Sequence, residues 1–93
     1  MEDIHHIQQK IMPILERYGA TRSAIFGSHA RGEATEKSDL DVLVDLPQGA
    51  TLLDLVELKD ALETALGMRV DVLTYGGIHP LLRDRIEREA VAL

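Results

Sequence analysis

The spacing between a Gly-Ser pair and an Asp-x-Asp motif constrains this chain most. An apolar run ends at Gly27–Ser28, and ten residues separate that pair from Asp39-Leu40-Asp41, which opens a second apolar run. Glycine has no Cβ, so the backbone at Gly27 can approach an anionic group closely, and the loop after it can direct N–H groups at phosphate oxygens. Alternate residues of a strand point to one face, so Asp39 and Asp41 are predicted to converge. The pattern predicts a phosphate cradle beside two carboxylates.

A third carboxylate, Asp71, stands between Val70 and Val72 in another apolar run. Burying an unpaired carboxylate is costly, so a cation site is the simpler explanation for it. Mg²⁺ prefers hard oxygen ligands and keeps several waters, so two or three carboxylates suffice to bind it. Two such ions can clamp the attacking and leaving oxygens of an in-line displacement. We predict that Asp39 and Asp41 bind two Mg²⁺ ions, and that Asp71 completes the metal site and helps to deprotonate the acceptor.

The segment GSHARGEATEKSDLDVLVD, followed by the third carboxylate at Asp71, resembles the nucleotidyltransferase superfamily. It is most similar to the minimal nucleotidyltransferase (MNT) branch, whose members are antitoxins paired with HEPN-domain toxins. The resemblance covers nearly the whole chain. It implies a small nucleotidyltransferase fold of the α+β (mixed α/β) class, with a mixed sheet of about three to four strands covered by helices.

The resemblance also implies an activity. A chain of this branch is expected to be a Mg-dependent protein adenylyltransferase that moves AMP from ATP onto a tyrosine hydroxyl of a cognate HEPN-type ribonuclease toxin. The protein would act as an antitoxin in a hetero-oligomer with that toxin. The alternative from a different class is a non-catalytic inhibitor that neutralises the toxin by direct binding. A small-molecule nucleotidyltransferase is disfavoured, because 93 residues leave no room for a separate substrate domain.

The other residues of the motif have expected roles in nucleotide binding. Gly27 and Ser28 should meet the β- and γ-phosphates through backbone N–H groups and the hydroxyl. Two roles stay open for Arg31: a charge-assisted contact to the phosphates, or an ion pair with one of the site aspartates. Ser38 is expected to form a supporting hydrogen bond near the Asp pair or to close a turn.

Three nearby residues are ambiguous. Asp45 shares the strand parity of Asp41, but it stands at the far end of the strand and is expected to be solvated. His29 is interpreted as a loop residue near the mouth of the site. Tyr75 follows a strand, where it could stack on the adenine but is more simply explained by packing.

Composition limits the possible partners. The net charge of −6 leaves no basic stripe for a phosphate backbone, and one Phe and two Tyr offer few rings for stacking unpaired bases. We therefore expect a protein partner and no stable binding to nucleic acid. The absence of cysteine fits the cytoplasm, and no apolar run approaches the length of a membrane span. The length indicates one domain over residues 1–93.

Periodicity and capping residues predict the order α-β-β-α-β-α. The first helix is expected at Ile4–Tyr18, with Asp3 as N-cap and a bend at Pro13. The second is expected at 52–66, between a Thr51–Asp54 capping box and Gly67. The third is expected to begin at His79-Pro80. Strands are expected at Ala20–Phe26, Val42–Leu46 and Arg69–Thr74. Two apolar helix faces are expected to be buried, one made by Leu52, Leu55, Val56, Leu58, Leu62 and Leu66 and the other by Leu81, Leu82 and Ile86.

Overall fold

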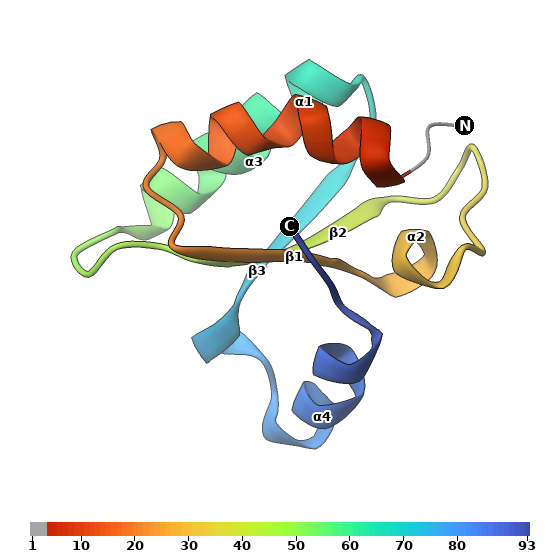
Figure 1. The fold of residues 1–93 in the computed structure, drawn as a ribbon. Coiled ribbons are helices and arrows are strands. Elements are labelled where there is room, and N and C mark those ends of the chain that lie inside the picture. The colour runs from red at the N-terminus through yellow and green to blue at the C-terminus, as the bar shows by residue number, and fades with distance from the viewer. Residues whose placement is uncertain (1–3) are drawn as a thin grey trace.

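A mixed four-stranded sheet organises the chain (Figure 1), of which the computed structural model describes residues 4–93. The strand order is β3-β2-β1-β4, with β1 at Arg22–Phe26, β2 at Leu40–Asp45, β3 at Val70–Thr74 and β4 at Val91–Ala92. Strand β1 is antiparallel to both β2 and β4, whereas β2 and β3 are parallel. This arrangement confirms the predicted α+β class and the mixed sheet.

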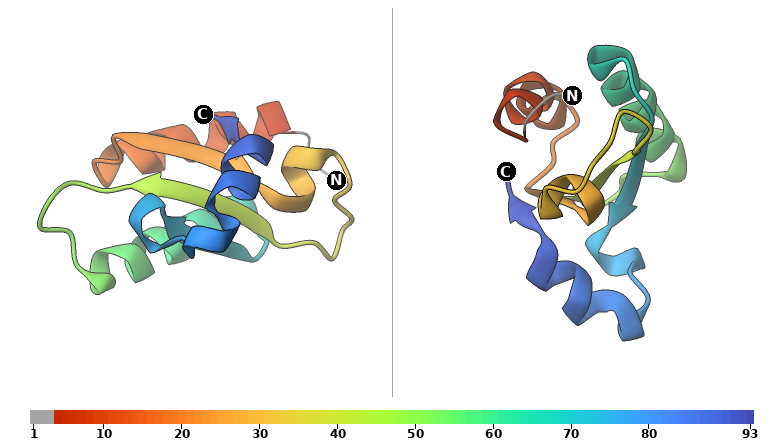
Figure 2. Two further views of the ribbon diagram at one scale, coloured as in Figure 1. Left: turned by 90° about the horizontal axis from the view of Figure 1, so that it is seen from below. Right: turned by 90° about the vertical axis from the view of Figure 1, so that its right-hand side faces the viewer.

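Helices lie on both faces of this sheet (Figure 2). Helix α1 (Ile4–Arg17) and helix α3 (Leu52–Leu66) cover one face, and helix α4 (Pro80–Glu89) lies against the other. A short helix α2 (Gly27–Arg31) follows β1, and a 3₁₀ turn η1 (Tyr75–Gly77) follows β3. Within residues 4–93, no helix combines the length and the apolar character that crossing a membrane requires.

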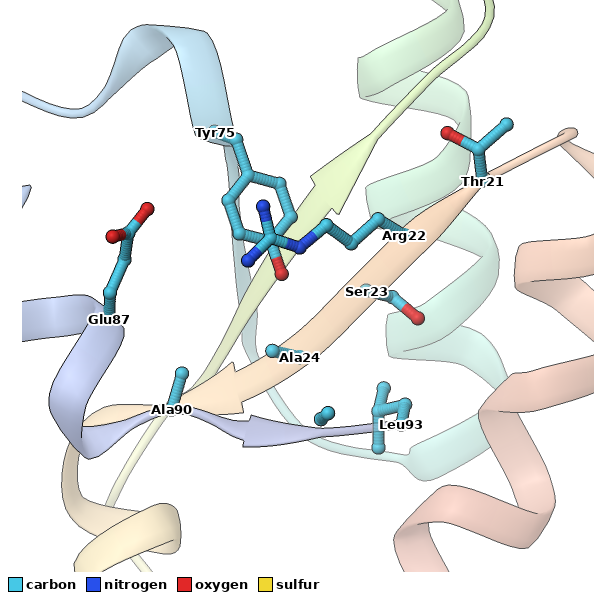
Figure 3. A pocket seen from close by; sticks show the side chains of 9 residues that line it. Thr21, Arg22, Ser23, Ala24, Tyr75, Glu87, Ala90 and Leu93 are labelled. Atoms are coloured by element: carbon cyan, nitrogen blue, oxygen red, sulfur yellow. The ribbon is translucent and has the colours of Figure 1, made fainter.

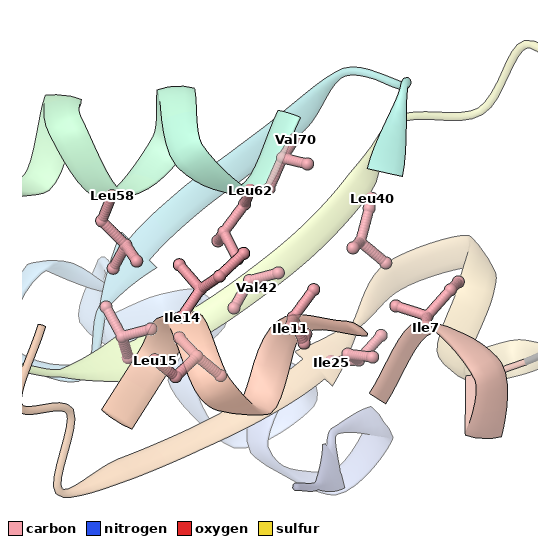
Figure 4. Packing of buried hydrophobic residues seen from close by; sticks show 11 residues of the cluster. Ile7, Ile11, Ile14, Leu15, Ile25, Leu40, Val42, Leu58, Leu62 and Val70 are labelled. Carbon is pink, nitrogen blue, oxygen red and sulfur yellow. The ribbon is translucent and has the colours of Figure 1, made fainter. Parts of the chain in front are cut away.

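The main core lies between the sheet and the pair α1 and α3 (Figure 4). Alternation along each strand explains it, because every second side chain points to this layer. Burial of each large aliphatic side chain is worth about 1.5–3 kcal/mol, so this layer is the principal source of stability. The buried members are Ile7, Ile11, Ile14, Leu15, Ile25, Leu40, Val42, Val44, Leu58, Leu62 and Val70.

A smaller cluster lies on the opposite face of the sheet. Ala24, Phe26 and Leu43 from the strands pack with Ile78, and the partly buried Ile86 of α4 rests against them. Because this cluster is small, α4 covers only part of this face. The uncovered part contains the carboxylates described below.

Local signals placed most helix ends correctly. Helix α3 begins with the predicted capping box, in which the Thr51 N–H donates to Asp54 Oδ2 at 2.7 Å and the Asp54 N–H donates to Thr51 Oγ1 at 3.3 Å. It ends at Gly67, whose φ of +66° is left-handed. Helix α1 continues through Pro13. The proposed N-cap Asp3 lies outside the described residues.

Two predictions of buried helix faces were partly wrong. In α3, Leu58 and Leu62 are buried and Leu55 and Leu66 are partly buried against the core, but Leu52 is 77% exposed and Val56 is also exposed, because these two, one turn apart, lie on the side of the helix turned away from the sheet. In α4, Ile86 turns inward as predicted, whereas Leu81 and Leu82 are exposed. Helix α4 therefore contacts the sheet mainly through its C-terminal half.

Candidate active site

Strand register brings the candidate site together. Within the sheet, the Cα of Asp41 is paired with Phe26 of β1 on one side and with Asp71 of β3 on the other. Gly27 follows Phe26 directly, so the Gly-Ser pair starts beside the carboxylates. Asp39 lies just before β2, and its negative charge acts on Asp41. The predicted motif residues thus gather at one end of the sheet.

Gly27 makes this approach possible. Its φ is +73°, and a Cβ built at this position would overlap Asp41 Oδ2. The backbone therefore lies against the carboxylate in a space that no side chain could share. A left-handed residue also turns the chain sharply away from the end of β1.

The Gly-Ser pair opens a helix, so the predicted loop was wrong at this point. Helix α2 contains Gly27–Arg31 and ends at Gly32, whose φ of +73° lets the Glu33 N–H donate to the Ser28 carbonyl at 2.9 Å. The first N–H groups of any helix lack intrahelical acceptors, and they favour anions. The N–H groups of Gly27 and Ser28 therefore remain suitable for phosphate oxygens.

Asp41 is the electrostatic centre of the carboxylate group. Burial raises its pKa, and the charges of Asp71 and Asp39 raise it further, while His29 and Arg31 lower it. The nearby negative charges of Asp71 and Asp39 therefore disfavour the ionised form of Asp41. A divalent cation would relieve that repulsion, because it supplies the opposite charge among hard oxygen donors.

Asp71 reaches this group for a different reason from the one predicted. Its side chain is exposed, so the argument that a buried carboxylate requires a cation was wrong. Val70 and Val72 point toward the α1 and α3 layer, and the alternation of the strand turns Asp71 to the opposite face. Its pairing with Asp41 is the observation that places it in the candidate site.

The donor set fits Mg²⁺ when phosphate oxygens and waters complete the coordination. Among residues 4–93, no three His, Cys, Asp or Glu side chains are arranged to hold a metal ion by themselves. Mg²⁺ is commonly bound through one or two carboxylates together with substrate phosphates. The neighbouring pair Asp41 and Asp71, with Asp39 beside them, supplies such a partial set.

Arg31 is held by glutamates, so the predicted ion pair with a site aspartate was wrong. Its Nε donates to Glu33 Oε2 at 3.2 Å, and its Nη1 donates to Glu89 Oε2 at 3.1 Å. Ser38 closes a turn, which is one of the two roles predicted for it. The Thr35 N–H donates to Ser38 Oγ at 2.9 Å, which shapes the approach to Asp39.

Asp45 and His29, whose roles the sequence left ambiguous, lie in different parts of the sheet and helix layers. Asp45 is exposed at the far end of β2, as predicted. His29 lies in α2 instead of a loop and is partly buried; in the described part of the chain its Nε2 atom is buried without a hydrogen-bond partner.

Tyr75 lies far from the carboxylates. It follows the end of β3, and the Arg22 guanidinium stacks 4.0 Å from its ring centroid in a pocket (Figure 3). Arg22 pairs with Asp45, four residues along β2 from Asp41, which corresponds to about 13 Å. The contact with Arg22 agrees with the packing role expected for Tyr75.

Sequence reasoning missed the partners of Arg31. Glu33 lies only two residues away, and a basic and an acidic residue so close in sequence give a weak local signal. Glu89 belongs to α4 and is 58 residues from Arg31. No spacing pattern connects the two, so only the packing of α4 against α2 reveals this contact.

The fold and the clustered motif define a nucleotidyltransferase. The family model described as a nucleotidyltransferase domain matches residues 9–93, and the chain belongs to this family. The resemblance to the MNT branch is confirmed. The chain is 57% identical over 89 residues, covering 96% of each chain, to a Methanocaldococcus jannaschii protein provisionally named a protein adenylyltransferase.

Solved structures agree with this assignment. One, provisionally described as a minimal nucleotidyltransferase, superimposes with a TM-score of 0.86 at 45% identity, over 99% of this chain and 97% of the other. Another contains a tri-AMPylated Shewanella oneidensis HEPN toxin in complex with an MNT antitoxin. It matches with a TM-score of 0.74 at 19% identity, over 95% of this chain and 69% of the other, and supports the fold alone.

Proposed function

We propose that this chain is a protein adenylyltransferase that acts as a single domain and moves AMP from ATP onto a protein hydroxyl. The observation that carries the proposal is the register pairing of Asp41 with Asp71 directly beside Gly27. This arrangement puts carboxylates next to backbone that an anion can approach. The transferase class agrees with the family to which the chain belongs.

Each residue has a role in this proposal. The β- and γ-phosphates would be held by the N–H groups of Gly27 and Ser28, by the Ser28 hydroxyl and by Arg31. Ser38 would keep the turn before Asp39 in place. Asp39, Asp41 and Asp71 would hold Mg²⁺, which when bound neutralises phosphate charge and orients the triphosphate.

The reaction itself is a substitution at the α-phosphorus. The acceptor oxygen forms a bond to that phosphorus as the bond to pyrophosphate breaks, and the proton of the acceptor hydroxyl passes to Asp71. Asp71 suits this role because its carboxylate is exposed on the open face of the sheet, where an acceptor can approach. The products are the AMP ester of the acceptor and pyrophosphate.

We propose a HEPN-type ribonuclease toxin as the acceptor, modified on a tyrosine in the cytoplasm. The AMPylated HEPN toxin bound to an MNT antitoxin of the same fold supports this partner. The net charge of −6 also favours a basic protein, and an RNA-binding ribonuclease must be basic where it holds RNA.

The test is incubation with labelled ATP, Mg²⁺ and a candidate HEPN toxin, followed by intact mass of both proteins. We expect the toxin to gain one or more AMP masses and to stay inactive after this chain is removed. Asp41→Asn should abolish the transfer. Asp45→Asn is the matched control, because Asp45 lies on the same strand and face but at the far end, and it should leave transfer intact. Transfer by Asp41→Asn at the wild-type rate would contradict the assignment.

The competing candidate is inhibition by binding alone. The toxin could bind to the exposed face of the sheet that contains the carboxylates without any transfer of AMP. A double variant with Asp39→Asn and Asp41→Asn separates the two functions. If it binds the toxin but does not protect cells at matched expression, the enzyme is supported; full protection with no added mass supports binding alone.

A further inference from the structure

An ion-pair cluster joins the C-terminal ends of helices α2 and α4 near the candidate site. Arg31 ends α2, and its Nη1 is 3.1 Å from Oε2 of Glu89, which ends α4. Glu89 Oε1 is also 3.5 Å from the Nε of Arg85 on the same helix. One carboxylate therefore connects two guanidinium groups and ties α4 to the helix that opens with Gly27.

The cluster leaves part of the Arg31 guanidinium available. Arginine has five N–H donors, and the two glutamates contact only Nε and Nη1. Within residues 4–93, no hydrogen bond is made by Nη2. The Arg31 side chain is 37% exposed, so it is accessible to a ligand.

The charges of the cluster balance. Arg31 and Arg85 offset Glu33 and Glu89, so an anion would be held by the directed N–H donors of Arg31 and not by net charge. Glu89 is 25% exposed and is therefore less screened by water than Glu33 at 67% or Arg85 at 72%. Arg31 is also close enough to the carboxylates for its charge to act on Asp41.

We propose that Glu89 is a positioning residue that holds the Arg31 guanidinium so that its free Nη2 donors face the triphosphate bound at Gly27–Ser28. The inference rests on the proposed function, since it takes a nucleoside triphosphate as the ligand. An arginine side chain has many rotamers, and fixing it before the nucleotide arrives lowers the entropy lost on binding. Glu89 acts through Arg31 and does not itself touch the nucleotide.

The experiment is calorimetric titration of the full chain with Mg-ATP. Glu89→Gln should weaken binding by about fivefold to tenfold, because a charge-assisted contact to Arg31 becomes a neutral one. Glu87→Gln is the matched control on the same helix, exposed and outside the cluster, and it should bind as the wild type does. In an Arg31→Gln background, Glu89→Gln should have no further effect, since the guanidinium that it positions is absent.

Several outcomes would overturn the inference. If Glu89→Gln binds Mg-ATP as well as the wild type does, Glu89 does not position Arg31 for the nucleotide. If the variant binds more tightly, Glu89 competes with the phosphates for the Arg31 guanidinium. An equal loss in the Arg31→Gln background would mean that Glu89 acts on something else. If thermal unfolding shows that Glu89→Gln does not fold, Glu89→Asp keeps the charge on a shorter side chain and should weaken binding in the same direction.

The proposed function can fail separately. A wild-type chain that binds Mg-ATP with the expected pattern among these variants, but transfers no AMP to any toxin, would contradict the transferase proposal and leave the role of Glu89 standing. A wild-type chain that binds no Mg-ATP would overturn both.

Discussion

Gly27→Ala tests the geometry of the candidate site most directly, because the loss of unfolding free energy that it should cause has two separable parts. The first is the left-handed φ of +73°, which costs a residue with a Cβ about 1–2 kcal/mol. The second is steric: the new Cβ would overlap Asp41 Oδ2 and would lie 3.1 Å from Asp41 Cγ. Forcing an extra methyl into a filled space costs about 1–3 kcal/mol more.

Gly67→Ala measures the energetic cost of the left-handed backbone conformation alone. Gly67 has a φ of +66°, and nothing lies within 4 Å of a Cβ built there. We therefore expect Gly67→Ala to lose about 1–2 kcal/mol of unfolding free energy and Gly27→Ala to lose about 2–5 kcal/mol. The difference of about 1–3 kcal/mol corresponds to roughly 4–24 °C in Tm for a chain of this size.

The assay is urea unfolding of both variants, paired with the AMP-transfer measurement. Gly27→Ala should lose transfer through displacement of Asp41, whereas Gly67→Ala should keep it. In an Asp41→Ala background, the excess cost of Gly27→Ala should fall, because the overlapping oxygen is gone. Equal destabilisation by the two glycine variants, with transfer retained by Gly27→Ala, would refute the close approach of Gly27 to Asp41.

Three further predictions concern charge and packing. Burial and the charges of Asp71 and Asp39 raise the pKa of Asp41 in the folded chain, so the folded state holds that proton more tightly than the unfolded state. The unfolding free energy should therefore fall as pH rises from the ordinary aspartate pKa through the raised one, and Asp41→Asn should remove that fall in urea titrations at several pH values. Asp71→Ala should lose most transfer yet largely keep Mg-ATP binding, measured by calorimetry; equal loss of both would make it a nucleotide ligand. Leu62→Ala should cost about 2–5 kcal/mol and Leu81→Ala almost nothing in thermal unfolding, because Leu62 is fully buried and Leu81 is 85% exposed.

Local chemistry explains what could be predicted about the fold. The Thr51–Asp54 box and Gly67 mark the ends of α3 through contacts within a few residues, and these marks are readable without the rest of the chain. Helix α2 and strand β4 were missed because five and two residues are too short to show periodicity. The exposure of Leu81 could not be predicted, since it depends on how far α4 reaches across the sheet.

The candidate site was predicted only in part for a related reason. Spacing identified Gly27, Asp39 and Asp41, but the position of Asp71 beside Asp41 depends on β3 docking parallel to β2. The glutamate contacts of Arg31 likewise require α2 and α4 to meet. The roles of these residues in catalysis remain predictions for the experiments above.

The parallel pairing of β2 with β3 also bears on the order of events in folding. Parallel neighbours cannot be joined by a tight turn, so the chain must pass through α3 before β3 can dock. Closing that long loop costs chain entropy, and the same step brings Asp71 against Asp41 and adds their repulsion. A chain that has paired β1 with β2 alone would already hold Gly27 near Asp41, yet it would lack the third carboxylate. Docking of β3 is therefore the step at which the carboxylate group becomes complete, whereas the pairing of β4 with β1, which joins Ala24 to Ala92, is the most non-local in this sheet.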